Sequence, residues 1–184
     1  CEMGYDGKGQ FRINEKNLEK FNERNLKNFV LEEIVNFKKE ISVIVCSSQK
    51  NIITYPPVEN IHKDSILRET IYPAKINAKL TKDAINMAIK ISNELKLEGV
   101  LAVEMFIDND NKILINELAP RPHNSGHWSI DFCQYSQFEN LISLIFNDFV
   151  KEPLPIKNCK MINVIGKEYE KKENLIKKYQ FYDY

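Results

Sequence analysis

Apolar and polar positions follow two different spacings along this chain, and together they predict a mixed α and β architecture. Runs of β-branched and apolar residues over 29–37 and 40–46 indicate two strands. A third run over 51–55 ends at a pair of prolines, which cannot donate to a sheet ladder. The pattern then places His62 in a loop and a further strand over 67–76.

Two segments have the apolar spacing of amphipathic helices. The first is predicted to begin with Thr81 as its capping residue and to run to about Leu97, where Gly99 ends it. The second opens with a capping box at Ser136 and Glu139 and runs to residue 149. Its apolar stripe is expected to be buried and consists of Phe138, Leu141, Ile142, Ile145 and Phe149.

The best-defined unit between these helices is a β-hairpin. Strand-like runs over 99–107 and 112–118 flank residues 108–111, which have the composition of a turn. If the loop has two or four residues, Glu104 and Glu117 lie on the same face as a diagonal cross-strand pair. Two like charges on an apolar hairpin repel each other unless a cation lies between them, and Mg²⁺ is commonly held by one or two carboxylates. The alternative is that a bulge or a three-residue loop turns one of the two glutamates to solvent.

Polar residues of several kinds follow directly after this hairpin. The segment INELAPRPHNSGHW at 115–128 has the composition of a loop that leaves a sheet edge, where a rigid fold commonly presents functional groups. The simpler alternative is a loop that only caps the sheet.

A glycine-rich segment near the start of the chain has two interpretations. Gly4, Gly7 and Gly9 surround Lys8, and glycines let backbone N–H groups approach an anion while the lysine supplies a positive charge. A plain hairpin turn at Asp6 and Gly7 explains the same residues. The spacing is not that of a Walker phosphate loop.

Composition excludes several classes of partner. The chain has 184 residues with 26 basic and 26 acidic side chains, so its net charge of zero indicates neither nucleic acid nor an anionic membrane surface. No apolar run approaches the roughly 18 residues that span a bilayer, so we expect a soluble protein. The four cysteines lie far apart without a CxxC pair, which favours a reducing cytoplasm over a disulfide framework or a zinc site. Because residue 1 is Cys rather than Met, we expect a fragment of a longer protein.

Three segments together resemble one enzyme family. They are GYDGKGQ at 4–10, LEEIVNFKKEISV at 31–43 and NELAPRPHNSGHW at 116–128, and the stretches at 55–62 and 136–140 fit the same family. The family is that of the N5-carboxyaminoimidazole ribonucleotide synthetases, which are ATP-grasp ligases of purine biosynthesis.

The resemblance implies an α+β ATP-grasp fold, present in part as an antiparallel sheet with flanking helices, plus a small C-terminal β-rich segment. It divides the chain into an ATP-grasp domain over 1–150, whose N-terminal part is missing, and the start of a small C-terminal domain over 151–184.

The resemblance also implies a role for each matching residue. ATP is expected to contact a mobile glycine-rich loop, an adenine-binding segment, a ribose-binding carboxylate and further positions, at Gly4, Tyr5, Asp6, Gly7, Lys8, Gly9, Gln10, Glu32, Glu33, Ile34, Val35, Glu40, His62, Asn116 and Glu117. Magnesium, with Mn²⁺ as an alternative, is implied at Glu104 and Glu117. Catalysis on bicarbonate and carboxyphosphate is implied for Arg121, His123 and Asn124, and substrate contacts are implied for Tyr5, Asp6, Arg121 and His123.

The implied reaction is the carboxylation of 5-aminoimidazole ribonucleotide. ATP phosphorylates bicarbonate to carboxyphosphate, and the substrate amine captures the carboxyl group, in a cytoplasmic enzyme that is a homodimer at full length. Family members carry segments before the glycine-rich loop and after the aromatic residues 181–184 that this chain lacks, so we expect an incomplete ATP cleft. The alternatives are another ATP-grasp ligase that uses a different acid such as formate, and a non-catalytic nucleotide-binding fragment.

Overall fold

A computed structural model of the chain describes residues 12–16, 30–147, 149–171, 174 and 177. The strands within them are β1 Phe37–Ser47, β2 Ile52–Thr54, β3 Val58–Lys63, β4 Ile66–Tyr72, β5 Gly99–Asp108, β6 Ile113–Ala119 and β7 Cys159–Ile162. The helices are α1 Ala78–Glu94, α2 Ser129–Phe132 and α3 Gln137–Asn147, with short 3-10 helices η2 Asn124–Gly126 and η3 Gly166–Lys171.

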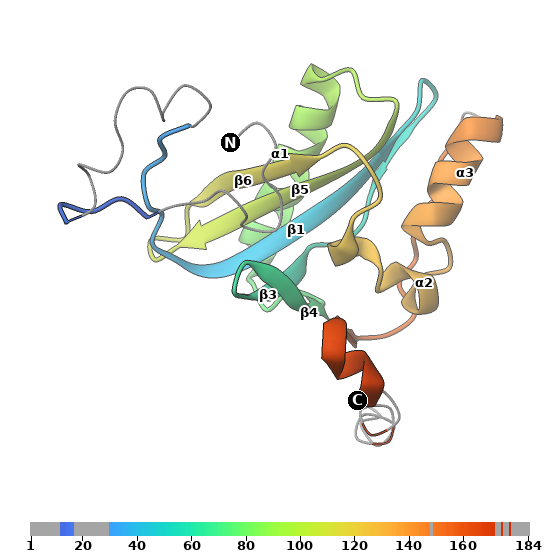
Figure 1. Ribbon diagram of the computed structural model, residues 1–184. Helices are drawn as coiled ribbons and strands as arrows, with labels where there is room; N and C mark the ends of the chain where they lie inside the picture. Colours follow the sequence, from blue (N-terminus) through green and yellow to red (C-terminus); the bar gives the residue numbers. More distant parts are fainter. Residues whose placement is uncertain (1–11, 17–29, 148, 172–173, 175–176, 178–184) are drawn as a thin grey trace.

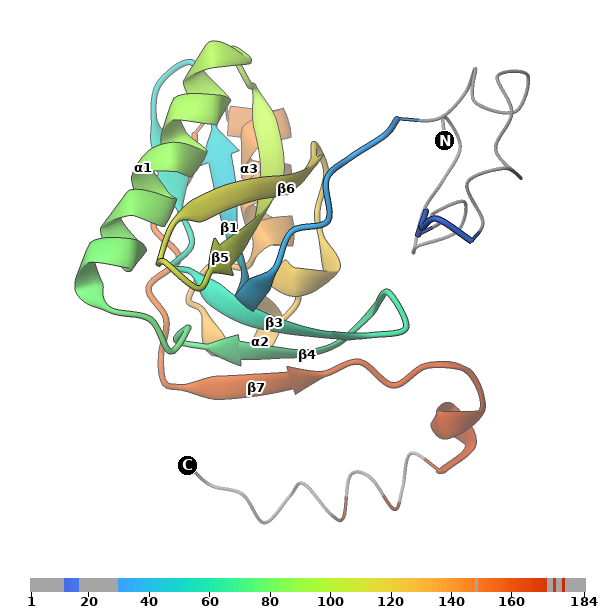
Figure 2. The same cartoon turned by 90° about the vertical axis from the view of Figure 1, so that its left-hand side faces the viewer.

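The described strands form one antiparallel sheet in the order β6-β5-β1-β3-β4-β7, and β2 pairs with β1 beside β3 (Figure 1). Helix α1 packs on one face of this sheet, and α2 and α3 pack on the opposite face (Figure 2). An antiparallel sheet between two helical layers confirms the predicted α+β class with flanking helices.

Strand β1 lies inside the sheet, between β5 and β3, and its second half is buried on both faces. Ile41, Val43 and Val45 pack against α1, whereas Ile44 and Cys46 belong to the core beneath α3. Cys46 is fully buried and serves as a small core residue.

The face that carries Ile44 and Cys46 changes from apolar to polar along the strand. Side chains alternate between faces, so Ser42 and Glu40 continue the same face toward the start of β1. Glu104 on β5 pairs with Ser42 and therefore lies beside it on this polar half. The sheet thus presents a polar surface next to a well-packed apolar core.

Helix α1 begins earlier than predicted. The Oδ1 atom of Asn77 accepts a hydrogen bond from the backbone N–H of Leu80 at 2.9 Å, so Asn77 and not Thr81 is the capping residue. Thr81 lies in the first turn, where its hydroxyl donates to the carbonyl of Asn77. The helix also ends earlier, at Glu94, because Lys96 adopts a left-handed φ of 49°.

The capping box of α3 is confirmed. Glu139 Oε2 accepts from the backbone N–H of Ser136 at 2.7 Å, and Ser136 Oγ accepts from the backbone N–H of Glu139 at 3.2 Å.

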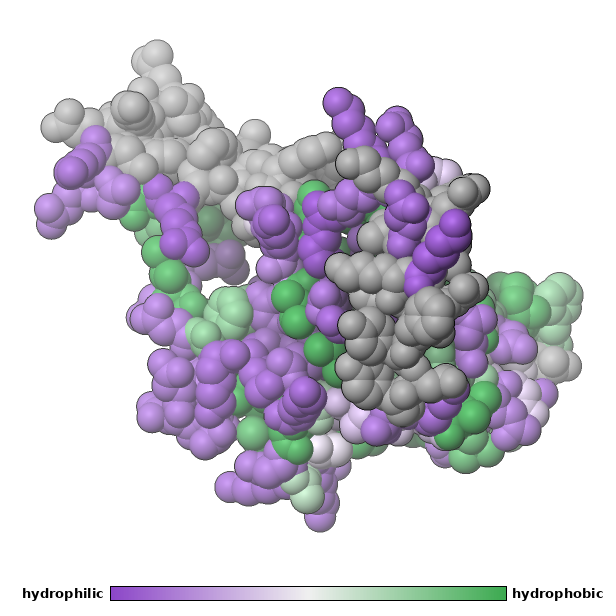
Figure 3. Space-filling model, turned by 90° about the horizontal axis from the view of Figure 1, so that it is seen from below, coloured by the Kyte–Doolittle hydropathy of each residue, from purple (hydrophilic) through white to green (hydrophobic). Residues whose placement is uncertain are grey.

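The predicted burial of the α3 stripe is right for Leu141 and wrong for its other residues, because the helix packs on the sheet through Leu141 and Leu144. Leu141 and Leu144 contact the core, and Leu141 is the one stripe residue that does so. The other stripe residues are exposed, namely Phe138, Ile142, Ile145 and Phe149. A green, hydrophobic area lies at the right-hand edge of Figure 3, on the side where Figure 1 places α3.

The hairpin forms as predicted, but its register is different. Ile107 pairs with Ile113, and a bulge at Asn116 then shifts the pairing, so that Glu104 lies directly opposite Glu117 rather than diagonally from it. The register is set by a turn over 108–112, which is longer than predicted.

The predicted strand over 29–37 is wrong in the part that the structure describes. Residues 30–36 have no regular structure and are mostly exposed. Phe37 is already opposite Asp108, where β5 ends, so these residues have no strand beside them in the described part of the sheet. A β-branched run does not form a strand without a hydrogen-bonding neighbour.

His62 lies in β3 and not in a loop, because β3 and β4 form a hairpin that extends to Lys63. Strand β4 ends at Tyr72, before the cis bond to Pro73, rather than at Ile76.

The segment that contains Pro153 and Pro155 contacts the rest of the fold. Pro153 is buried, and Pro155 forms an isolated bridge with Cys133. Strand β7 then pairs with β4 at the edge of the sheet. The division of the chain between 150 and 151 stays a prediction. None of the described helices has the length and apolar composition to cross a membrane.

Candidate active site on the polar half of the sheet

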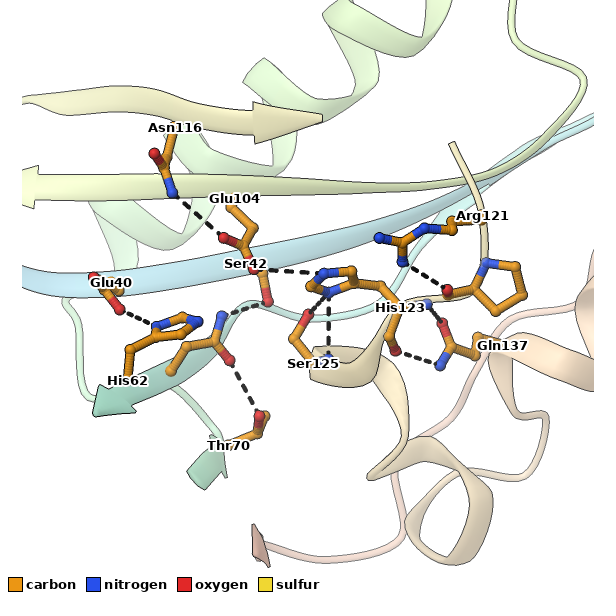
Figure 4. Close-up of polar contacts among 12 residues, drawn as sticks. Glu40, Ser42, His62, Thr70, Glu104, Asn116, Arg121, His123, Ser125 and Gln137 are labelled. Carbon is orange, nitrogen blue, oxygen red and sulfur yellow. Dashed lines mark hydrogen bonds and ion pairs between the residues drawn. The ribbon is translucent and has the colours of Figure 1, made fainter. Parts of the chain in front are cut away.

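Glu104 and Glu117 face each other on the polar half of the sheet. The amide nitrogen of Asn116 donates to Glu104 Oε2 at 3.4 Å, and Figure 4 shows Asn116 on one side of Glu104 and His123 on the other. Glu104 is only 9 % exposed, whereas Glu117 is exposed. One carboxylate is therefore held by the protein, and the other is open to a ligand.

The charges around Glu104 disfavour its ionised form. Burial raises the pKa of Glu104, and the negative charges of Glu117 and Glu40 raise it further. His62 opposes this shift, and so does the hydrogen bond from Asn116. A cation beside Glu104 would favour its ionised form.

Glu40 and His62 form a close pair across β1 and β3. The Nδ1 atom of His62 lies within hydrogen-bond distance of Glu40 Oε2. This hydrogen bond raises the pKa of His62, and burial opposes the shift. The imidazole of His62 is thereby placed among the carboxylates of Glu40, Glu104 and Glu117, whose charges also raise its pKa.

A buried chain of polar side chains lies beside this pair. Asn60 Nδ2 donates to Ser42 Oγ at 2.9 Å, and Thr70 Oγ1 donates to Asn60 Oδ1 at 3.2 Å (Figure 4). All three residues are buried. These residues could not be predicted from the sequence, because a Ser, an Asn and a Thr on three separate strands carry no signal until the sheet brings them together.

Gln137 fixes the backbone of His123. The His123 N–H donates to Gln137 Oε1 at 2.9 Å, and Gln137 Nε2 donates to the His123 carbonyl at 2.7 Å. Gln137 is fully buried. An amide that satisfies both backbone groups of one residue holds that residue rigidly against α3.

The imidazole of His123 is neutral at physiological pH. Burial lowers the pKa of His123 to about 4, and the charges of Arg121, His127 and His62 act in the same direction. His123 Nε2 lies 3.7 Å from Glu104 Oε1. Because the ring is uncharged, this contact is not an ion pair at neutral pH.

Arg121 and Asn124 lie on either side of His123 in the chain. Arg121 is exposed, and its Nη1 donates to the carbonyl of Pro122 at 3.4 Å. In Figure 4 the guanidinium group is drawn beside His123, whose pKa its charge lowers. Asn124 is half-buried at the start of η2, where its carbonyl accepts from the backbone N–H of His127.

The structure does not bring together all the predicted nucleotide-binding residues. Glu32, Glu33 and Ile34 are exposed and Val35 is half-buried, in the segment without regular structure. The glycine-rich loop at 4–10 lies outside the described residues.

The Glu104–Glu117 pair fits magnesium by its chemistry. Mg²⁺ is usually held by one or two carboxylates, with water and substrate oxygens as its other ligands. Burial is the main reason that the pKa of Glu104 is raised, with smaller contributions from the charges of Glu117 and Glu40, and a divalent cation beside Glu104 would offset the shift. Within the described residues, no group of three or more His, Cys, Asp and Glu side chains is arranged to hold a metal by itself.

Known proteins share this fold. The N5-carboxyaminoimidazole ribonucleotide synthase of Bacillus subtilis (strain 168) is 42% identical over 190 residues, which cover 100% of this chain and 50% of the relative. A crystal structure of carboxyaminoimidazole ribonucleotide synthase from Aspergillus clavatus, complexed with ATP, has a TM-score of 0.83 at 31% identity and covers 94% of this chain and 48% of its own. A second structure from that organism, with ADP and 5-aminoimidazole ribonucleotide, has a TM-score of 0.68 at 33% identity, with coverages of 72% and 36%.

The chain spans about half the length of the curated relatives it matches. The ATP-grasp domain family matches residues 1–138, which are three quarters of the chain. This match confirms the fold that the sequence resemblance implies. The chain therefore belongs to the ATP-grasp domain family.

Proposed function

We propose that the protein encoded by the complete open reading frame of this chain carboxylates 5-aminoimidazole ribonucleotide, with ATP and bicarbonate as the other substrates. The single observation that carries the proposal is the pairing of Glu104 with Glu117, with His123 Nε2 at 3.7 Å from Glu104 Oε1. The names of the relatives, including one complex with ADP and this ribonucleotide, support the same reaction.

The residues on the polar half of the sheet have complementary roles in this proposal. Magnesium held between Glu104 and Glu117 would neutralise charge on the ATP phosphates during transfer to bicarbonate. Arg121 offers a planar set of N–H donors that suits bicarbonate or a phosphate. His123 and Asn124 orient the carboxyphosphate by hydrogen bonds, and Asn116 holds Glu104.

Other residues are assigned to ATP. We infer that Glu40 accepts from ribose hydroxyls, with His62 beside it, and that residues 32–35 contact adenine. The glycine-rich segment at 4–10 is assigned to the ATP phosphates, where exclusion of water would protect carboxyphosphate from hydrolysis. Tyr5 and Asp6 in that loop also contact the ribonucleotide.

Phosphate release by the complete protein tests the reaction. Release is expected only when ATP, bicarbonate and the aminoimidazole ribonucleotide are all present. Glu117→Gln should abolish it with an unchanged circular dichroism spectrum, because the exposed carboxylate supports ligand binding rather than the fold. Turnover without bicarbonate would contradict the proposal.

Glu59→Gln is the matched control for this variant. Glu59 is a half-buried carboxylate of the same sheet that pairs with Lys39 at 2.6 Å, on the face opposite Asn60. Its loss should lower stability and leave the rate per folded molecule unchanged. A panel of acids, with formate in place of bicarbonate, distinguishes the carboxylating reaction from that of another ATP-grasp ligase. Nucleotide binding without turnover of any acid would favour a non-catalytic protein.

We further propose that this protein works as a homodimer in the cytoplasm. The exposed apolar side chains of α3 support an interface between two copies, because such residues are characteristic of surfaces that another protein covers.

A further inference from the structure

The ring of His123 is anchored through its Nδ1 atom. The backbone N–H of Ser125 lies 3.3 Å from Nδ1, and the Ser125 hydroxyl lies 2.8 Å from the same atom. A backbone N–H can only donate, so Nδ1 is the acceptor and carries no proton. In the neutral ring the proton must then be on Nε2.

The Nε2–H group of His123 points toward the polar half of the sheet with no hydrogen bond of its own. Its nearest recorded neighbour is Glu104 Oε1 at 3.7 Å, which is longer than an N–H···O hydrogen bond. Within the part of the chain that the structure describes, Nε2 has no closer polar partner. This N–H is therefore available to an oxygen of a ligand bound beside Glu104.

Ser125 is held so that its hydroxyl cannot turn away. It is fully buried in η2, and the next residue, Gly126, donates from its backbone to the His123 carbonyl at 2.9 Å. Gln137 bonds to both backbone groups of His123 from the other side. The ring and the hydroxyl are thus parts of one rigid unit.

We propose that Ser125 is a positioning residue that sets the tautomer of His123, so that His123 donates an N–H to an anionic substrate oxygen and acts neither as a base nor as a metal ligand. The identity of that oxygen, from bicarbonate or a phosphate, rests on the proposed function, whereas the tautomer does not. With the opposite tautomer, the lone pair of Nε2 would face the Glu104 carboxylate and would bind a cation there.

Nitrogen NMR of the histidine rings tests the tautomer directly. The chain has three histidines, so the signals of His123 are readily assigned with a His123→Gln spectrum. At pH 7.5, on the order of a unit above the ordinary pKa of histidine, we expect a non-protonated Nδ1 and a protonated Nε2. A proton on Nδ1 would overturn the proposal.

Alanine variants of two buried serines in the same segment distinguish an effect on the His123 ring from a general loss of stability. Ser125→Ala removes the closer of the two donors to Nδ1 and leaves only the backbone N–H at 3.3 Å, so the two nitrogen signals of His123 should move toward each other as the tautomers mix. Ser129→Ala is the control, because Ser129 is equally buried, donates to the Gly126 carbonyl at 2.6 Å and accepts from the Gln137 backbone N–H at 3.1 Å, but makes no bond to the His123 ring. Unchanged signals in Ser125→Ala, or equal mixing in Ser129→Ala, would contradict the proposal. If Ser125→Ala does not fold, Ser125→Cys should move the two nitrogen signals of His123 in the same direction, because a thiol is a weaker donor than a hydroxyl.

Activity of the complete protein gives an independent reading. A Gln side chain has its amide nitrogen as many bonds from Cβ as Nε2 of His, and Asn has its nitrogen at the distance of Nδ1. A donor role at Nε2 predicts that His123→Gln keeps a kcat at least about 10-fold above that of His123→Asn. Equal losses would indicate a base and overturn the proposal. Phosphate release that does not depend on bicarbonate would instead contradict the proposed function, and the tautomer found by NMR would still hold.

Discussion

Glu117 lies opposite Glu104 because Asn116 is bulged out of β6. In the register that pairs Met105 with Ile115, Glu104 would face Asn116, and Glu117 would face Val103 on the side of α1. The bulge moves Glu117 to the polar half of the sheet. Bulges are common beside active sites, where they re-aim side chains and increase the local twist of the strand.

Replacement of Glu104 should separate its effect on stability from its effect on metal binding. The pKa of Glu104 is raised, so the stability that this group contributes is present below its unfolded pKa and is lost as the pH rises through its folded pKa. Glu104→Gln is therefore expected to melt at a higher temperature than the wild type at neutral pH without metal. Added Mg²⁺ should raise the melting temperature of the wild type but not that of Glu104→Gln.

Glu59→Gln serves again as the control, because it loses the ion pair with Lys39 and should melt lower with or without metal. Equal stabilisation of the wild type and Glu104→Gln by Mg²⁺ would show that the ion binds elsewhere.

His123 should make the fold sensitive to acid. Its pKa is lowered to about 4 from an ordinary value of 6.5, so its contribution to stability is complete above pH 6.5 and is lost as the pH falls toward 4. His62 has the opposite sign, because its pKa is raised by Glu40. Between pH 7 and 4.5, urea unfolding should show the wild type losing on the order of 2 kcal/mol more than His123→Gln. A parallel loss in both proteins would mean that another group controls the acid response.

Much of the candidate site could be predicted from the sequence, because its parts are local. The alternation of side chains in one hairpin placed Glu104 and Glu117 on one face even though the predicted register was wrong. A longer turn and the bulge at Asn116 together restored the pairing, and neither has a strong signal in the residues. The capping box at Ser136 was also local and was found.

Interactions between distant segments could not be predicted in this way. The bonds from Gln137 to His123 join a helix start to a loop, and Gln137 reads as an ordinary polar residue of a capping box. The prediction that the α3 stripe is buried was wrong for most of its residues for the same reason. The helix is apolar on two sides, and only the fold decides which side packs on the sheet.

A charged side chain on the exposed apolar side of α3 should change the oligomeric state of the protein. Ile142 is 54 % exposed on this side, so Ile142→Lys should leave the melting temperature nearly unchanged and convert a dimer of the complete protein to a monomer. Sedimentation velocity measures the outcome. Leu141→Lys is the contrasting variant and should unfold the helix, because Leu141 packs on the core. A monomeric wild type would refute the dimer.

The cysteines should be protected from alkylation in the native state. Burial raises the pKa of both Cys46 and Cys133 to about 12, so almost no thiolate is present at pH 8. Iodoacetamide labelling followed by mass mapping should modify these two residues only after urea is added. Rapid labelling of Cys46 in native buffer would contradict the burial of β1.

Within the segment 115–128, Gly126 should be the residue that tolerates a side chain least. A Cβ atom there would lie 2.6 Å from Gln137 Oε1 and 2.9 Å from Gln137 Nε2. Since Gln137 is fixed by His123, Gly126→Ala must break those hydrogen bonds, at a cost of about 1–3 kcal/mol in urea unfolding. Gln137→Ala removes the same bonds and also the obstacle, so the double variant should cost clearly less than the sum of the two single changes. Strict additivity would show that the methyl group and the amide do not meet.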